Sequence, residues 1–117
     1  MERSSHRPRV ICHMMSSLDG RLVPKDWPVS PEGRRQYELV HASHEADGWI
    51  CGRINGGMLC AGLIDEVSVL VAPVVDARMG TPALFDVAGD AAAPRRLALE
   101  QMERRADDML WLGYRVE

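Results

Sequence analysis

Two short glycine-containing turns hold the residues of this sequence best suited to binding a ligand. The Ser16 to Gly20 turn (SSLDG) follows an apolar run and leaves a strand at its carboxyl end, where open α/β sheets bind ligands. The Gly52 to Gly57 turn (GRINGG) opens a helix, where small residues let backbone N–H groups approach a pyrophosphate. Each turn also has a structural interpretation, the first as a strand-to-loop turn whose aspartate accepts backbone amides, the second as a tight helix entry.

Histidines and cysteines suggest other chemistry, which their spacing does not favour. His41 and His44 are three residues apart with acidic neighbours, but nothing else completes a metal-ligand set, so we expect helix-surface histidines and no metal site. The sequence has three cysteines, an odd number, and none of them has the C-x-x-C spacing. Cys12, Cys51 and Cys60 are therefore expected to be buried, reduced thiols in a cytoplasmic protein.

The composition is that of a single soluble domain. The chain has 117 residues, of which 46% are hydrophobic, and a net charge of −3. This mild acidity gives no general attraction to nucleic acid or to an anionic membrane, so a phosphorylated ligand needs local cations or backbone amides. No apolar run approaches the ~20 residues that span a bilayer. Residues 1–8 are polar and are expected to form a flexible lead-in rather than a signal peptide.

The pattern of apolar residues predicts an α/β domain over residues 9–117. Strands are expected at 9–15, 49–51, 67–75, 97–102 and 109–116. The run at 67–75 is apolar on both faces, which indicates a central strand, and the last two strands should pair as an antiparallel hairpin. Ser30 and Pro31 suit the start of a helix reaching about Ala46, and a second helix is expected at 55–61, with Gly62 ending it.

Several motifs in a fixed order resemble one enzyme family. Residues 8–53 contain PRVICHMMSSLDGRL, WPVSPEGRRQY and EADGWICGR, and residues 54–117 contain INGGMLCAGLIDEVSVLVAPVV, GTPALFD and MLWLGYRVE. Together these stretches resemble the reductase domain of the bifunctional riboflavin-biosynthesis deaminase-reductases and their single-domain relatives. SLDG alone is a weak signal. Its combination with W-x-x-S-P and AGLIDE in this order is specific.

The resemblance implies a dihydrofolate-reductase-like three-layer α/β fold with a mainly parallel central sheet and a C-terminal antiparallel hairpin. Members of the family are considerably longer, with further strands and helices in the middle. The chain therefore looks like a truncated form of the fold. Its N-terminal block (9–53) and C-terminal block (54–117) would be joined at Gly52-Arg53, with the family's central segment missing.

The activity implied is NADPH-dependent hydride transfer to a 5-amino-6-(5-phosphoribosylamino)uracil-like pyrimidine or to a pterin. No catalytic side chain is expected, because the site aligns two rings and excludes water. The implied cofactor contacts are Met15, Ser17, Trp27, Gly52, Arg53, Ile54, Asn55 and Gly56. The implied substrate contacts are Asp19, Lys25, Arg34 and His41.

The sequence also departs from the family's pattern and leaves alternatives open. His41 stands where relatives have an arginine for the substrate's phosphate, and Lys25 stands where they often have a small polar residue. Residues 49–51 (WIC) replace the family's Glu-Gly-Gly. Trp27 could instead be an exposed hydrophobic lid or interface residue, and Arg34 could belong to a solvated helix face.

Two functional hypotheses follow. The first is a reductase that forms a homodimer, since a second copy could cover the strand edges that the missing centre leaves unpaired. The second is a non-catalytic truncated remnant that acts as a dimerisation or binding module, with the 67–75 strand and the hairpin forming its interface.

Overall fold

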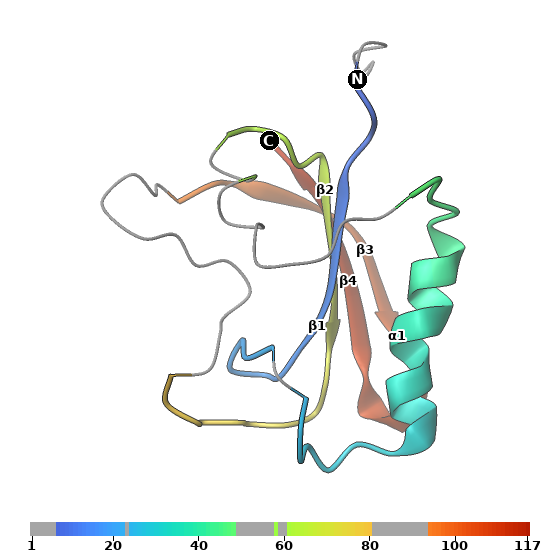
Figure 1. Cartoon of the computed structure of the whole chain (residues 1–117), viewed down its shortest axis with the longest axis vertical. Helices are drawn as coiled ribbons and strands as arrows, with labels where there is room; N and C mark the ends of the chain where they lie inside the picture. The colour runs from blue at the N-terminus through green and yellow to red at the C-terminus, as the bar shows by residue number, and fades with distance from the viewer. Residues whose placement is uncertain (1–6, 23, 49–57, 59–60, 81–93) are drawn as a thin grey trace.

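The computed structural model of the chain describes residues 7–22, 24–48, 58, 61–80 and 94–117. Figure 1 shows the sheet with helix α1 (Pro31–Ser43) beside it. The elements, in chain order, are β1 (Ile11–Ser16), α1 (Pro31–Ser43), β2 (Glu66–Val71), β3 (Leu97–Arg104), a 3-10 turn (Ala106–Asp108) and β4 (Leu110–Val116). The α/β class expected from the sequence is confirmed.

The sheet is mixed rather than mainly parallel over the described strands. Its order is β1-β2-β4-β3. Only β1 and β2 run parallel, whereas β4 is antiparallel to both β2 and β3. The 3-10 turn makes β3 and β4 a hairpin, and β4 then adds to β2 in the antiparallel direction. The strand expected at 49–51 lies outside the described residues. The central position of β2 and the C-terminal hairpin are confirmed.

Helix α1 begins where the sequence predicts. The Ser30 hydroxyl accepts the N–H of Gly33, and Pro31 occupies the first turn. The carboxylate of Asp107, in the hairpin turn, accepts the N–H of Ser30 and so ties the helix start to the sheet. The helix ends at Ser43, earlier than the expected Ala46, because Glu45 has a φ of +50°, which no continuing helix allows.

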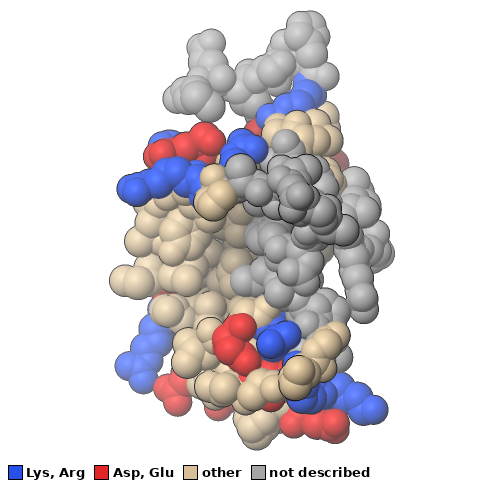
Figure 2. Space-filling model, turned by 90° about the vertical axis from the view of Figure 1, so that its left-hand side faces the viewer, with Lys and Arg blue, Asp and Glu red and all other residues tan. Residues whose placement is uncertain are grey.

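Two buried clusters lie on opposite faces of the sheet. On the α1 side, Tyr37 packs against a cluster made of Trp27, Leu70, Ala72, Val74 and Met109. On the other side lie Cys12, Met14, Ile64, Val67 and Val69. Figure 2 shows this second side of the molecule, where the charged residues of the described surface gather towards its two ends and uncharged residues lie between them. Burial, expected for Cys12, is confirmed and raises the pKa of its thiol to about 11.

The segment before β2 supports one further prediction. Gly62 has a φ of +72°, and the N–H of Leu63 donates to the carbonyl of Met58 at 2.9 Å. This is the hydrogen-bond pattern of a helix that ends at a left-handed glycine, as expected for Gly62. The rest of that predicted helix, apart from Met58 and Ala61, lies outside the described residues. So do Cys51, Cys60 and the junction at Gly52-Arg53.

The N-terminal segment is held to the start of β2. Arg7, which the sequence assigns to a flexible lead-in, donates two hydrogen bonds to the carboxylate of Asp65, and Arg9 pairs with Glu66. Among the described residues, no helix is long and apolar enough to cross a membrane.

Candidate functional site

Two loops meet at the carboxyl ends of β1 and β2. Because these strands are parallel, the SSLDG turn after β1 and the residue 72–78 loop after β2 leave the sheet at the same edge. The N–H of Leu18 donates to the carbonyl of Val74 at 2.7 Å, and the N–H of Ala72 donates to the carbonyl of Ser16 at 2.8 Å. The two loops therefore form one unit.

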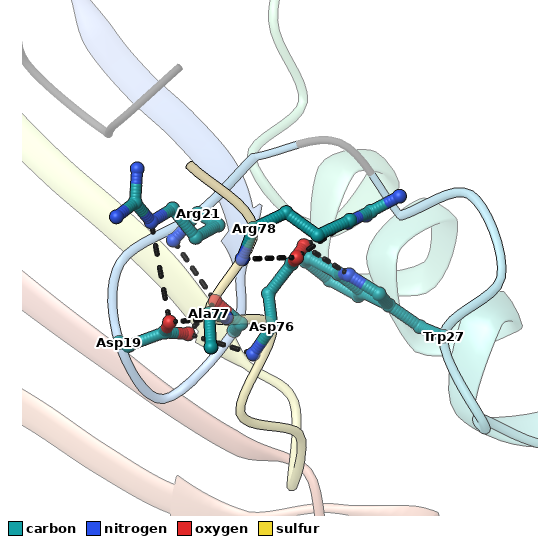
Figure 3. Close-up of polar contacts among 7 residues, drawn as sticks. Asp19, Arg21, Trp27, Asp76, Ala77 and Arg78 are labelled. Atoms are coloured by element: carbon teal, nitrogen blue, oxygen red, sulfur yellow. Dashed lines mark hydrogen bonds and ion pairs between the residues drawn. The ribbon is translucent and has the colours of Figure 1, made fainter. Parts of the chain in front are cut away.

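Asp19 joins this unit through both of its carboxylate oxygens (Figure 3). Oδ1 accepts the Ser17 hydroxyl at 2.5 Å and the N–H of Asp76 at 3.0 Å, and Oδ2 accepts the N–H of Ala77 at 2.8 Å. These donors, the Ser17 hydroxyl foremost, lower the pKa of Asp19 to about 2. The loop-ordering role considered for Asp19 is confirmed, and its contact with a substrate stays a prediction.

Asp76 is the buried centre of the site. Its side chain is 1% exposed and accepts the Trp27 indole N–H at 2.7 Å, together with two bonds from the Arg78 guanidinium at 2.5 and 2.8 Å. Figure 3 shows Trp27 and Arg78 converging on this carboxylate. Arg78, followed by the Trp27 indole, holds the pKa of Asp76 well below its usual range. Neither Asp76 nor Arg78 is among the site residues predicted from the sequence.

A cavity of about 230 Å³ lies between the Trp27 segment and the residue 72–78 loop. It is lined by Lys25, Asp26, Trp27, Pro28, Val74, Val75, Asp76 and Arg78. Trp27 is only 5% exposed and belongs to the buried cluster on the α1 side, so it is a wall of the cavity rather than an exposed lid. The volume is below the roughly 300–1,000 Å³ of most small-molecule sites, which suits one ring with its substituents rather than a whole dinucleotide.

The other expected cofactor contacts support this site from within. Met15 packs against the Trp27 cluster. Ser17 is 1% exposed, and its hydroxyl donates to Asp19 and accepts the N–H of Arg21, so it is used inside the turn. Neither residue lines the cavity. The remaining five expected contacts, Gly52 to Gly56, lie outside the described residues, so whether their turn shares a cleft with SSLDG stays a prediction.

The expected substrate contacts are placed differently from one another. Lys25 lines the cavity beside Trp27. Arg34 donates to the backbone carbonyls of Trp27 and Pro24, at 3.1 and 3.4 Å, and so holds the loop that carries Lys25. His41 is exposed in the last turn of α1, about 15 Å along the helix from Pro31. The structure brings Lys25 and Trp27 together and leaves His41 away from the cavity.

Metal ligands do not gather in the described residues. Within those ranges, no group of three or more histidine, cysteine, aspartate or glutamate side chains is placed to hold a metal ion.

Comparison with known proteins gives a result at the level of fold. No protein-family profile matches the sequence, and no curated protein matches it. Solved structures do match. A protein named as a riboflavin biosynthesis protein, from Shewanella sp. PV-4, has a TM-score of 0.60 at 14% identity, over 94% of this chain and 99% of that one.

Two further structures agree. RibD of Acinetobacter baumannii has a TM-score of 0.65 at 15% identity over 97% of this chain, which spans 59% of the RibD chain. A pyrimidine reductase-like protein of Corynebacterium diphtheriae has a TM-score of 0.52 at 18% identity, over 78% of this chain and 37% of that one. The resemblance expected from the motifs is thus confirmed in three dimensions: the chain has the α/β fold of the riboflavin-biosynthesis and pyrimidine reductase-like proteins.

Proposed function

We propose that this chain binds NADPH and acts as a reductase of the riboflavin-biosynthesis type. The observation that carries the proposal is the cavity beside Trp27, built where two joined loops leave parallel neighbouring strands. Ligands of open α/β sheets bind at this edge. The fold shared with riboflavin-biosynthesis and pyrimidine reductase-like proteins supports the same assignment.

The residues around the cavity fit part of a nicotinamide nucleotide. Val75 is largely exposed and supplies apolar surface for a flat ring beside Trp27. Lys25 supplies positive charge for a neighbouring phosphate, whereas the charge of Arg78 is balanced by Asp76. NADPH, when bound, supplies the hydride for the reduction. A cavity of about 230 Å³ takes one ring and its ribose, so the rest of the dinucleotide must lie outside it.

The chain's own contribution is to fix the geometry of the site. Asp19 holds the two loops together, and Asp76 fixes the indole of Trp27 and the guanidinium of Arg78. Preorganised walls of this kind align reacting groups without a covalent catalyst.

The proposed substrate is a pyrimidine related to 5-amino-6-(5-phosphoribosylamino)uracil, or a pterin. Lys25 is the predicted substrate contact best placed to meet a phosphate, because Arg34 is engaged with backbone carbonyls and His41 lies near the far end of α1. The homodimer stays a proposal. Leu99 and Met102, exposed on the edge strand β3, offer apolar surface for it.

Titration of the protein with NADPH, followed by nucleotide fluorescence, tests this function. We expect saturable binding in the micromolar range. Lys25→Met should raise Kd about tenfold, which corresponds to about 1.4 kcal/mol. Arg35→Met is the matched control, because Arg35 is exposed on α1, lies outside the cavity lining and should leave Kd unchanged. A flat titration with folded protein would refute NADPH binding and favour the non-catalytic remnant.

A further inference from the structure

A second cluster, unrelated to the cavity, lies between the sheet and α1. The Ser68 side chain of β2 is buried, and three ring nitrogens contact its hydroxyl oxygen. His13 Nδ1 lies at 3.0 Å, His44 Nε2 at 3.2 Å and Trp111 Nε1 at 2.8 Å. These residues come from β1, the end of α1 and β4, so one hydroxyl connects three elements.

The hydroxyl has one hydrogen to donate and two lone pairs to accept with, and this determines the donor and the acceptor in each of the three hydrogen bonds. The Trp111 N–H is only a donor and takes one lone pair. His13 Nε2 lies 3.1 Å from the carbonyl oxygen of Tyr37, which only accepts, so this nitrogen must carry a hydrogen. A neutral His13 therefore has a bare Nδ1 that accepts the Ser68 hydrogen. His44 must then donate its Nε2–H to the second lone pair.

Comparing the number of donor hydrogens with the number of acceptor sites shows how many extra protons His13 and His44 can take up while every hydrogen bond of the network stays intact. If His44 is charged, its Nε2–H still donates to Ser68, and nothing else changes. If His13 is charged, it donates to Ser68, whose hydrogen can turn to a bare Nε2 of His44. If both are charged, three donors face two lone pairs, and the Ser68 hydrogen has no acceptor. Two positive rings would also stand with centroids 5.3 Å apart.

We propose that the Ser68 hydroxyl makes the docking of the last turn of α1 sensitive to pH, because the network closes with at most one extra proton on His13 and His44. A second proton breaks it. His44 caps the C-terminus of α1, so the break acts directly on that end of the helix. The helix start is held separately by Ser30 and Asp107 and should stay docked.

The groups around the two histidines determine the pH range in which the network breaks. Burial lowers the pKa of both His13 and His44 below the ordinary value. His41 of α1 lowers the pKa of both, Arg9 of the N-terminal segment lowers that of His44, and Glu66 of β2 raises it. Among the described residues, Tyr37 of α1 is also stacked on His13, and Trp111 of β4, with Arg105 over its ring, also faces the cluster.

The sign of the pH dependence follows from these directions. Both histidines bind protons more weakly in the folded state than in the unfolded chain. Their stabilising effect is therefore complete above the ordinary histidine value near pH 6.5 and is lost as the pH falls below it. If unfolding takes up one extra proton, the unfolding constant rises by up to tenfold for each unit by which the pH falls. If it takes up two, the constant rises by up to a hundredfold for each unit.

NMR of the full chain with ¹⁵N-labelled histidine tests the hydrogen-bond assignment. We expect His13 in its Nε2–H tautomer above neutral pH. On acidification, His13 and His44 should titrate in two separate steps, and the second should coincide with a shift or loss of the Trp111 indole N–H signal. An Nδ1–H tautomer for neutral His13, or an indole signal unchanged through both steps, would overturn the proposal.

Urea unfolding between about pH 4.5 and 6.5 provides the second test. His44→Gln keeps an N–H donor for Ser68 but cannot titrate, so the unfolding constant should change by up to tenfold less per pH unit than in the wild type. His41→Gln is the control: His41 makes no bond to Ser68, so the variant loses only the lowering effect of His41 on the two pKa values. The lower limit of the pH range should move up slightly, and the wild-type steepness should remain. Equal steepness in His44→Gln and wild type would contradict the proposal. If His44→Gln does not fold, the wild-type NMR titration decides.

Discussion

Replacing Leu70 with alanine tests whether the buried cluster on the α1 side supports the cavity. Leu70 is completely buried in the centre of β2 and shares its cluster with Trp27 and Met109. Leu→Ala removes three carbons, or about 2.4 kcal/mol at about 0.8 kcal/mol for each. The cavity left behind adds to this, so we expect a total loss of about 3–4 kcal/mol in the free energy of unfolding.

Urea unfolding measures the stability change, and NADPH titration measures the consequence for the site. With an m value of about 2 kcal/mol/M, a loss of 3 kcal/mol lowers the urea midpoint by about 1.5 M. Because the cluster that holds Trp27 loses one of its members, Kd for NADPH should rise several-fold. Val69→Ala is the matched control, since Val69 is the next residue of β2 but belongs to the cluster on the opposite face.

The control separates general destabilisation from damage to the cavity wall. Val69→Ala removes two carbons and should cost about 2 kcal/mol, yet leave Kd nearly unchanged. A loss of less than about 1 kcal/mol in the free energy of unfolding for Leu70→Ala would refute the reasoning, because removing a fully buried leucine side chain from a packed cluster costs more than that. Equal increases in Kd for the two variants would show that the cluster on the α1 side has no special relation to the site.

Two further predictions concern the loops and the helix. Asp19→Asn should weaken the acid dependence of stability: the pKa of Asp19 is lowered to about 2, so its stabilising effect is present above its ordinary value of 3.8 and is lost as the pH falls towards 2. Urea midpoints between those pH values should change less in the variant than in the wild type, and equal changes would contradict the role of Asp19. Ser30→Ala removes the cap of α1 and should cost about 1 kcal/mol by urea unfolding, whereas Ser43→Ala, at the other end of the helix, should cost less.

The elements that could be predicted from the sequence are those set by local chemistry. Ser30 and Pro31 specify a helix start through a side-chain cap and a fixed φ, and the structure shows the helix starting there. The apolar run at 67–75 indicates a strand buried on both faces, and β2 lies between β1 and β4, although it ends at Val71, earlier than expected. Gly62 needs no partner far along the chain to end a helix.

Contacts between distant segments could not be predicted in this way. Trp27 follows an aspartate and precedes a proline in a loop, a setting typical of an exposed side chain. Its side chain is nevertheless buried, in a cluster that includes Val74 and Met109, and its indole N–H bonds to Asp76. Arg34 is of a residue type common on solvated helix faces, yet its guanidinium donates a hydrogen bond to the backbone carbonyl of Trp27. In both cases the deciding partner is set by the tertiary fold.

Asp76 and Arg78 are different, because a signal for them was present. The SSLDG turn was singled out because it leaves a strand at its carboxyl end, where α/β sheets bind ligands. The same rule applies to the next parallel strand, and Asp76 and Arg78 are the first charged residues after the apolar run of β2. Parallel neighbours place their carboxyl ends at one edge, so charged residues after both strands should be considered together. Applied to both loops, the rule leads to Asp19 and Asp76, the two carboxylates on which this site is built.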